Sequence, residues 1–226
     1  MKHYLFILNF LCSFSVCAQV SGNCNAPFDS PDALVEILIG EGVEFSNATF
    51  SGFDCSAGFF NGASNIGFES GLVMATDGVE SITPGGFGAP GFGIPGFDLD
   101  LSNQLEIVGA TSTDLNNLIV LEFDFIPTSD VVTFNYVFAS NEYPSYTCSQ
   151  YNDIFGFFLS GPDITGDFED DAVNIALVPN PNDPSVYTNT PVIINTINSG
   201  IPTSFDGSGP CDAIDPNWQD YSVFFY

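Results

Sequence analysis

Oxygen-bearing side chains in three short segments are the residues of this sequence that offer chemistry. Carboxylate and amide oxygens in loops are the ligands that Ca²⁺ takes in proteins. Asp98 and Asp100 lie two positions apart, so an extended backbone would place both on one face. The plainer alternative is that these are solvated loop acids or turn-capping side chains. The three candidate Ca²⁺ clusters are Asp98 with Asp100, Asn141 and Glu142 with Asn152 and Asp153, and Asp167 with Glu169, Asp170 and Asp171.

The near absence of cationic side chains excludes whole classes of mechanism. The 226 residues include 28 Asp or Glu, one residue of the Lys and Arg class, and one His. The two cations are Lys2 and His3, so none follows the first three residues. Nucleophilic catalysis that uses an imidazole base is therefore excluded. Nucleic-acid binding, which depends on Lys and Arg, is excluded as well.

Catalysis would have to use carboxylates alone, as a glycoside hydrolase does with two Asp or Glu residues. With 28 acids, some pair at a suitable spacing is inevitable, so such a pair has little weight. Sugar-binding clefts usually stack several tryptophans, whereas Trp218 is the only one here. We therefore expect a non-catalytic binding or adhesion module for an extracellular glycan or protein, with no organic cofactor. A carboxylate-based hydrolase and a purely structural stalk domain are the alternatives.

The elements that must position these residues are predicted to be mostly strands. A helix is expected from Pro31 to Ile39, because Ser30 is a good N-cap and Gly40 a good terminator. Alternation of apolar and polar residues then predicts a mainly β fold, an antiparallel β-sandwich or jelly roll with this one short N-terminal helix. The expected strands cover residues 43–47, 71–76, 118–126, 131–139, 153–159, 173–178, 192–197 and 221–226.

Several segments between the expected strands have a distinctive composition. Pro127 to Asp130 is a turn signal, so residues 118–126 and 131–139 are expected to form a hairpin. Residues 179–191, rich in Pro and Asn, are predicted to be a loop. Residues 84–97, rich in Gly and Phe, are either an aromatic loop that touches a partner or a flexible connection that folds back onto the core.

The N-terminus and the cysteines predict export. Residues 1–18 have a positive start, an apolar run and small residues at Val16 and Ala18, as in a cleaved secretory signal peptide. A single domain of residues 19–226, secreted or on the cell surface and without a transmembrane segment, would remain. Its four cysteines predict two disulfides, for which three connectivities exist. The least entangled one pairs Cys24 with Cys55 and Cys148 with Cys211.

Several blocks resemble the choice-of-anchor L domain, a family of secreted and cell-surface proteins found mainly in Bacteroidota. The resemblance implies no enzymatic activity. It also implies C-terminal anchoring signals that vary, often a type IX secretion sorting domain. Because the chain stops at Tyr226 inside an apolar strand pattern, we expect the final strands and any sorting domain to be missing. The most specific blocks are residues 66–76, 121–125, 136–144, 152–162, 174–179 and 194–198.

Overall fold

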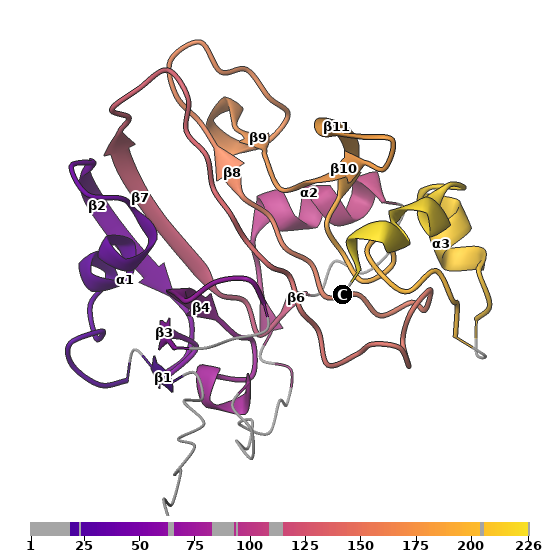
Figure 1. Ribbon diagram of the computed structural model, residues 1–226, viewed down its shortest axis with the longest axis horizontal. Helices are drawn as coiled ribbons and strands as arrows, with labels where there is room; N and C mark the ends of the chain where they lie inside the picture. Colours follow the sequence, from indigo (N-terminus) through magenta and orange to yellow (C-terminus); the bar gives the residue numbers. More distant parts are fainter. Residues whose placement is uncertain are drawn as a thin grey trace, which may run out of the picture. The chain divides into compact units, whose positions relative to one another are not determined.

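The computed structural model describes residues 19–22, 24–62, 66–82, 93, 95–108, 115–203 and 206–225. The predicted signal peptide and most of the Gly- and Phe-rich segment lie outside these residues. The chain forms two compact units, drawn together in Figure 1 and described separately below. Unit 1 comprises Met1–Phe92 with Ile119–Val132, and unit 2 comprises Gly93–Leu118 with Thr133–Tyr226.

Unit 1 contains two small antiparallel sheets. One has the order β1-β3-β4 and the other pairs β2 with β7 (Figure 1). The predicted strands at 43–47, 71–76 and 118–126 are confirmed, and along β7 exposed and half-buried residues alternate as expected. The elements of unit 1 are β1 (Gln19–Gly22), α1 (Pro31–Leu38), β2 (Glu44–Ser51), β3 (Ala57–Asn61), β4 (Ser70–Met74), η1 (Val79–Ile82) and β7 (Val120–Ile126).

The N-terminal helix forms where its capping residues predict it. The Ser30 hydroxyl accepts a hydrogen bond from the Ala33 N–H at 3.3 Å, which satisfies one of the free N–H groups of the first turn. Leu34 and Val35 are buried and anchor α1 in unit 1. The predicted bridge between Cys24 and Cys55 is present, with the two Cα atoms 4.7 Å apart.

Unit 2 contains more helix than we expected. Two further α-helices and two 3₁₀ turns correct the prediction of a single N-terminal helix, and its sheets are short antiparallel pairs without a closed sandwich. The predicted strand at 221–226 is replaced by a 3₁₀ segment. The elements are β5 (Pro95–Gly96), α2 (Leu99–Ile107), β6 (Leu115–Asn116), β8 (Phe158–Leu159), η2 (Glu169–Asp171), β9 (Val173–Asn174), β10 (Leu177–Asn180), β11 (Asp183–Pro191), α3 (Gly209–Ile214) and η3 (Trp218–Phe224).

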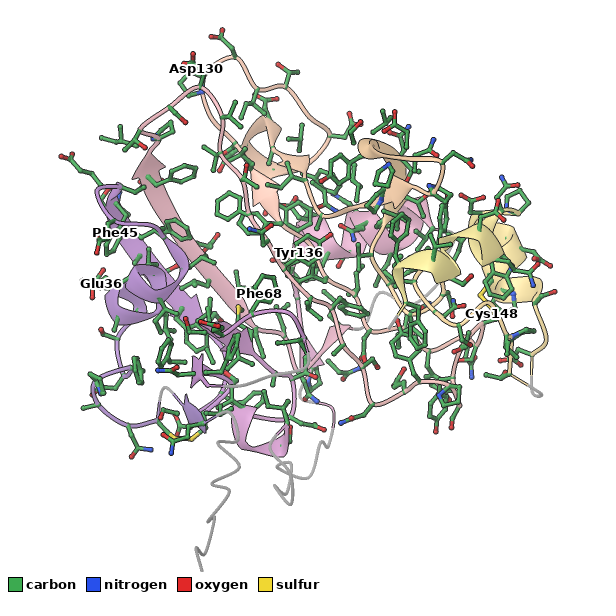
Figure 2. The ribbon with its side chains drawn as sticks, in the orientation of Figure 1. Glu36, Phe45, Phe68, Asp130, Tyr136 and Cys148 are labelled. Atoms are coloured by element: carbon green, nitrogen blue, oxygen red, sulfur yellow. A yellow bond between two sulfur atoms is a disulfide. The ribbon has the colours of Figure 1, made fainter. Side chains whose placement is uncertain are left out.

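Two predicted connections differ from the structure. Residues 179–191 are not a loop, because β10 and β11 pair as an antiparallel hairpin with register shifts around Pro179. The hairpin expected between 118–126 and 131–139 is also wrong, since β7 pairs with β2 and residues 131–140 form no strand. Two aromatic contacts of the predicted strand are nevertheless present: Phe134 packs on Phe157 and Tyr136 on Phe155, with ring centroids 4.4 and 5.1 Å apart. Figure 2 labels Tyr136, which is 39% exposed.

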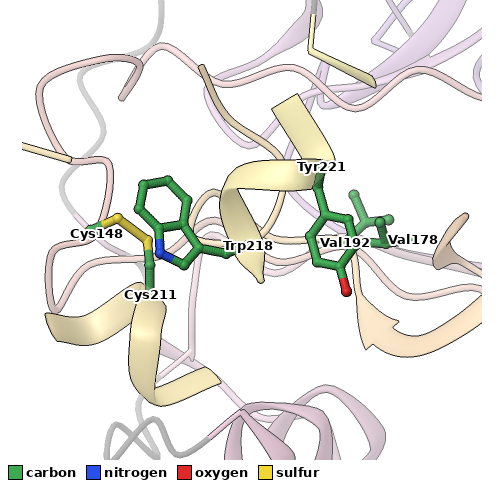
Figure 3. Packing of buried hydrophobic residues seen from close by; sticks show 6 residues of the cluster. All are labelled: Cys148, Val178, Val192, Cys211, Trp218 and Tyr221. Carbon is green, nitrogen blue, oxygen red and sulfur yellow. A yellow bond between two sulfur atoms is a disulfide. The ribbon is translucent and has the colours of Figure 1, made fainter. Parts of the chain in front are cut away.

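The core of unit 2 is built around the second predicted disulfide. Cys148 and Cys211 are joined, and Trp218, Tyr221, Val178 and Val192 pack with them (Figure 3). Every residue of this cluster is at most 5% exposed, so the large aromatic rings contribute most of the buried apolar area. The bridge closes a loop with a sequence separation of 63. Constraining the unfolded chain in this way contributes about 4 kcal/mol.

Some carboxylates in each unit accept hydrogen bonds from neutral donors. In unit 1, Asn47 donates from its side-chain amide to Asp124 at 2.6 Å across the β2–β7 pair. In unit 2, the Trp218 indole N–H donates to Asp212 at 2.8 Å and the Tyr221 hydroxyl to Asp215 at 2.5 Å. Hydroxyl, amide and indole groups thus take the place that Lys and Arg occupy in most proteins.

Candidate binding loop

Residues 140–153 form a loop of unit 2 that we call the tyrosine loop. Its two ends are joined by the Ser140 hydroxyl, which donates to the Asp153 carboxylate at 2.5 Å. The same Ser140 oxygen accepts the Glu142 N–H at 3.0 Å. The first bond holds the start of the loop against its end, and the second fixes the local backbone at its start.

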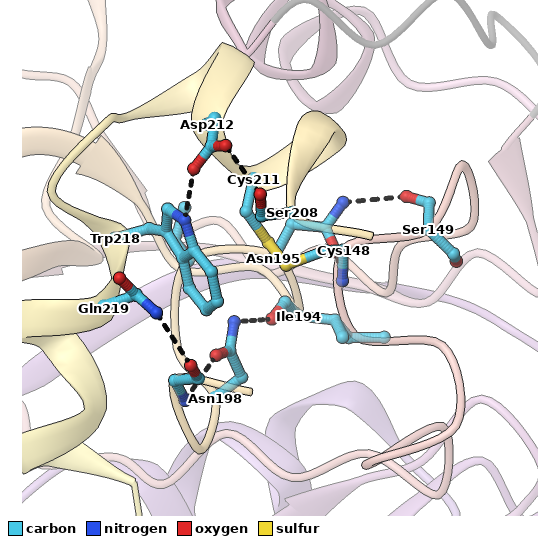
Figure 4. The surroundings of a disulfide bond; sticks show 12 residues. Cys148, Ser149, Ile194, Asn195, Asn198, Ser208, Cys211, Asp212, Trp218 and Gln219 are labelled. Carbon is cyan, nitrogen blue, oxygen red and sulfur yellow. Dashed lines mark hydrogen bonds between the residues drawn. A yellow bond between two sulfur atoms is a disulfide. The ribbon is translucent and has the colours of Figure 1, made fainter. Parts of the chain in front are cut away.

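A buried asparagine holds the tyrosine loop from beneath. Asn195 is 1% exposed. Its side-chain oxygen accepts the Cys148 N–H at 2.7 Å, and its amide donates to the Ser149 carbonyl at 2.9 Å (Figure 4). Its backbone N–H also donates to Asn152 Oδ1 at 3.2 Å. With its side-chain amide and its backbone N–H, Asn195 therefore satisfies three polar groups of the loop, which makes the loop geometry specific.

The rest of the loop base is equally constrained. Thr147, Cys148 and Ser149 are buried, and the Thr203 N–H donates to the Thr147 carbonyl at 2.9 Å. The Cys148–Cys211 bridge ties the middle of the loop to α3. A loop with a covalent tie at its centre loses little conformational entropy when a ligand binds to it.

Two tyrosines stand out from this constrained base. Tyr146 and Tyr151 are 44% and 55% exposed, and their rings lie edge to face, 5.7 Å apart at 87°. Exposed aromatic rings on a rigid support are the side chains that most often anchor a ligand. We did not single out these residues from the sequence. The available signal was two tyrosines flanking a half-cystine within a hydrophilic stretch.

Tyr143 has a different role within the same loop. Its hydroxyl donates to the Ile197 carbonyl, and its ring packs edge-on against Phe225 at 5.0 Å. Burial, followed by the nearby Asp153 charge, raises the pKa of the Tyr143 hydroxyl above its ordinary value. Tyr143 is therefore a neutral tether at the loop base.

Two members of the second predicted cluster, Glu142 and Asp153, interact near the two ends of the tyrosine loop. Burial and the adjacent Asp153 charge raise the pKa of Glu142 from 4.5 to about 7. The Glu142 Oε2 atom is buried and has no hydrogen-bond partner among the described residues. We call Glu142 and Asp153 the carboxyl pair. Because of its burial, Glu142 holds its proton more tightly than a free glutamate does.

The first and third predicted clusters also meet, in an arrangement that differs from our expectation. Asp98 and Asp100 are not on an extended strand, because Asp98 caps α2 by accepting the Leu101 N–H at 2.8 Å. Asp100 in the first helical turn accepts the Glu169 N–H of η2 at 2.8 Å. Asp167 and Asp170 are exposed, and Asp170 has a left-handed backbone with φ of 53°.

These contacts make the clusters part of the hydrogen-bonded framework. Asp98 and Asp100 serve as a helix cap and a loop clasp, which is the plainer interpretation of their sequence positions. In the parts of the chain that the structure describes, no three acidic or cysteine side chains converge on one metal position.

A separate hollow lies beside the β10–β11 turn and η3. Its volume is about 330 Å³, and Pro181, Asn182, Gln219, Asp220, Ser222 and Val223 line it. Neither Glu142 nor Asp153 lines this hollow. The hollow is therefore separate from these two carboxyl groups.

Comparison with known protein families identifies the family of this chain. The family model of the choice-of-anchor L domain covers residues 24–224. No curated protein and no solved structure matches the chain. The two disulfides are typical of extracellular proteins, and no helix among the described residues is long and apolar enough to cross a membrane. On the match to nearly its whole length, the chain belongs to the choice-of-anchor L family.

Proposed function

We propose that this protein is a non-catalytic extracellular or cell-surface module that binds its ligand through the tyrosine loop. The observation that carries the proposal is the exposed Tyr146–Tyr151 pair on a loop held by Asn195 and a disulfide. Rigid aromatic side chains supply contact area at a low entropic cost. A binding surface needs this combination of exposed rings and a fixed base.

A hydrolase is the second candidate, because a glutamate of raised pKa beside an aspartate is the usual acid and base pair of glycosidases. Two features favour binding over hydrolysis. The Glu142 Oε2 atom is buried, whereas a general acid must reach the glycosidic oxygen. The hollow beside η3 is lined by other residues.

We also propose that short sheets of unit 2 belong to a larger antiparallel sandwich. Phe134 faces Phe157 and Tyr136 faces Phe155, so the two segments run antiparallel in a constant register. Residues 153–159 include β8, which pairs with β9. Ile154 of the same segment forms a β-bridge with Ile193. Residues 131–139 would then be an outer strand of this arrangement.

Export and Ca²⁺ complete the proposal. Residues 1–18 would direct secretion and be removed, which leaves 28 acids with no Lys, Arg or His. Mutual repulsion of these charges opposes a compact state, and Ca²⁺ would relieve it because it binds several carboxylates at once. The charge balance of the whole chain supports this part of the proposal.

The binding role is tested by surface plasmon resonance on immobilised neutral polysaccharides and extracellular proteins. Wild-type protein is compared with Tyr146→Ala/Tyr151→Ala. The control is Tyr187→Ala, which removes an exposed tyrosine side chain from β11. We expect the control to retain the binding that the double variant loses. Equal binding by both variants, or release of reducing ends from a bound glycan, would overturn the proposal.

A further inference from the structure

The charge of the chain restricts what the tyrosine loop can bind. Between residues 19 and 226 every charged side chain is an acid, because Lys2 and His3 are the only cations of the sequence. An anionic ligand would approach a surface that offers it no Lys, Arg or His partner. A cationic ligand is attracted by the whole field of the protein.

The local arrangement of rings is selective as well. The Tyr146 and Tyr151 rings meet at 87°, so they form two walls of a corner. A sugar ring stacks best on a flat aromatic platform, whereas a compact cation is stabilised by aromatic faces on more than one side. The π faces of both rings carry partial negative charge that a cation can use.

The carboxyl pair lies at the ends of the same loop. The Tyr146 N–H donates to the Glu142 carbonyl at 2.9 Å, so one short turn connects the first carboxyl residue to the first ring. Asp153 follows Tyr151 by two positions, and its carboxylate is held by Ser140. The Asp153 carboxylate therefore follows the second ring along the chain, whereas the Oε2 atom of Glu142 is buried.

We propose that the tyrosine loop binds the cationic side chain of a Lys or Arg residue presented by a partner protein, in the corner that the Tyr146 and Tyr151 rings form. This inference rests on the proposed binding role of the loop. The inference adds the chemical class of the ligand. The experiment below distinguishes a wrong ligand class from a wrong binding role.

The test uses two blocked hexapeptides, one alternating Lys with Gly and one alternating Gln with Gly. Their affinities are measured by calorimetry on the full chain at 150 mM salt, where long-range attraction is largely screened. Tyr146→Ala/Tyr151→Ala and Tyr187→Ala are compared because none of these changes alters the net charge. Diffuse attraction to an acidic protein is therefore the same in all of them.

We expect the Lys peptide to bind wild type and Tyr187→Ala equally, and to bind the double alanine variant about 5-fold more weakly. Tyr146→Phe/Tyr151→Phe should retain the affinity, because the ring faces remain. Equal binding of the Lys peptide to wild type and to the double alanine variant would overturn the inference. If the double variant loses a ligand of the earlier panel while the Lys peptide binds all variants alike, the binding role stands and the cationic ligand is wrong.

Discussion

The Ser140 hydroxyl donates a 2.5 Å hydrogen bond to the Asp153 carboxylate. This bond closes the tyrosine loop over a sequence separation of 13. Both residues belong to the family-specific blocks of the sequence. Their contact converts two segments that resemble the family into the two ends of one loop. The same bond gives an aspartate a neutral partner in a chain without Lys or Arg after residue 3.

Removing this clasp should loosen the loop. In Ser140→Ala, Asp153 and the Glu142 N–H both lose a partner, so we expect the free energy of unfolding to fall by about 1–2 kcal/mol. Hydrogen exchange of the loop amides should accelerate. Ser185→Ala is the matched control, because Ser185 makes a similar 2.6 Å bond to Asp183 at the exposed start of β11. Equal effects of the two changes would refute a special role for the clasp.

Truncating the amide beneath the loop should cost more. Asn195→Ala leaves the Cys148 N–H and the Ser149 carbonyl buried and unpaired, so we expect a loss of about 2–4 kcal/mol in denaturant unfolding. The exposed Asn182 is the control, and Asn182→Ala should change stability by less than about 0.5 kcal/mol. A small effect of Asn195→Ala would show that the loop does not depend on this support.

The carboxyl pair predicts a pH dependence of stability. The pKa of Glu142 is about 7 in the folded protein and 4.5 when unperturbed, so the folded state binds the proton more tightly. The resulting stabilisation is complete below pH 4.5 and is lost as the pH rises through about 7. With chelator present, Glu142→Gln should therefore be more stable than wild type at pH 8 and similar to it at pH 4.5.

The control for this experiment is Glu106→Gln, which removes an exposed carboxylate from α2. Its stability curve against pH should follow that of wild type. If Glu142→Gln also follows the wild-type curve, the proton on Glu142 is not linked to folding.

Calcium should raise the thermal stability of the intact chain. Adding a chelator at matched ionic strength is expected to lower Tm by several degrees, because a ligand that binds only the folded state stabilises it by mass action. Sodium at the same ionic strength controls for screening of the 28 carboxylates. An unchanged melt in chelator would remove Ca²⁺ from the proposal.

The elements that the sequence predicted correctly are those with local causes. The Ser30 cap and Pro31 determine where α1 begins, and alternation along residues 118–126 determines which face of β7 is half-buried. The second disulfide could also be anticipated, although only as one of three connectivities. These features depend on residues close together in the chain or on simple exclusion.

The errors have non-local causes. In residues 131–139 the sequence alternates, and Phe134 and Tyr136 pack on Phe157 and Phe155 as residues of a strand would. A ladder also needs aligned backbone partners, and those depend on segments far along the chain. We expected Asp98 and Asp100 on one face of an extended segment, whereas Asp98 caps α2. An aspartate can occupy either position, so its residue type alone does not distinguish a helix cap from a strand residue.

The residue composition shows an acidic chain with no cationic side chain after His3, and its motifs indicate the choice-of-anchor L family. Its cysteines also predicted the two disulfides. Composition and motif order decide these properties whatever the fold. The tertiary structure alone decided that Asn195 supports the loop from 46 residues away and that Tyr146 and Tyr151 meet as an exposed pair. Burial and contact arise only when distant segments pack together, so no spacing in the sequence encodes them directly.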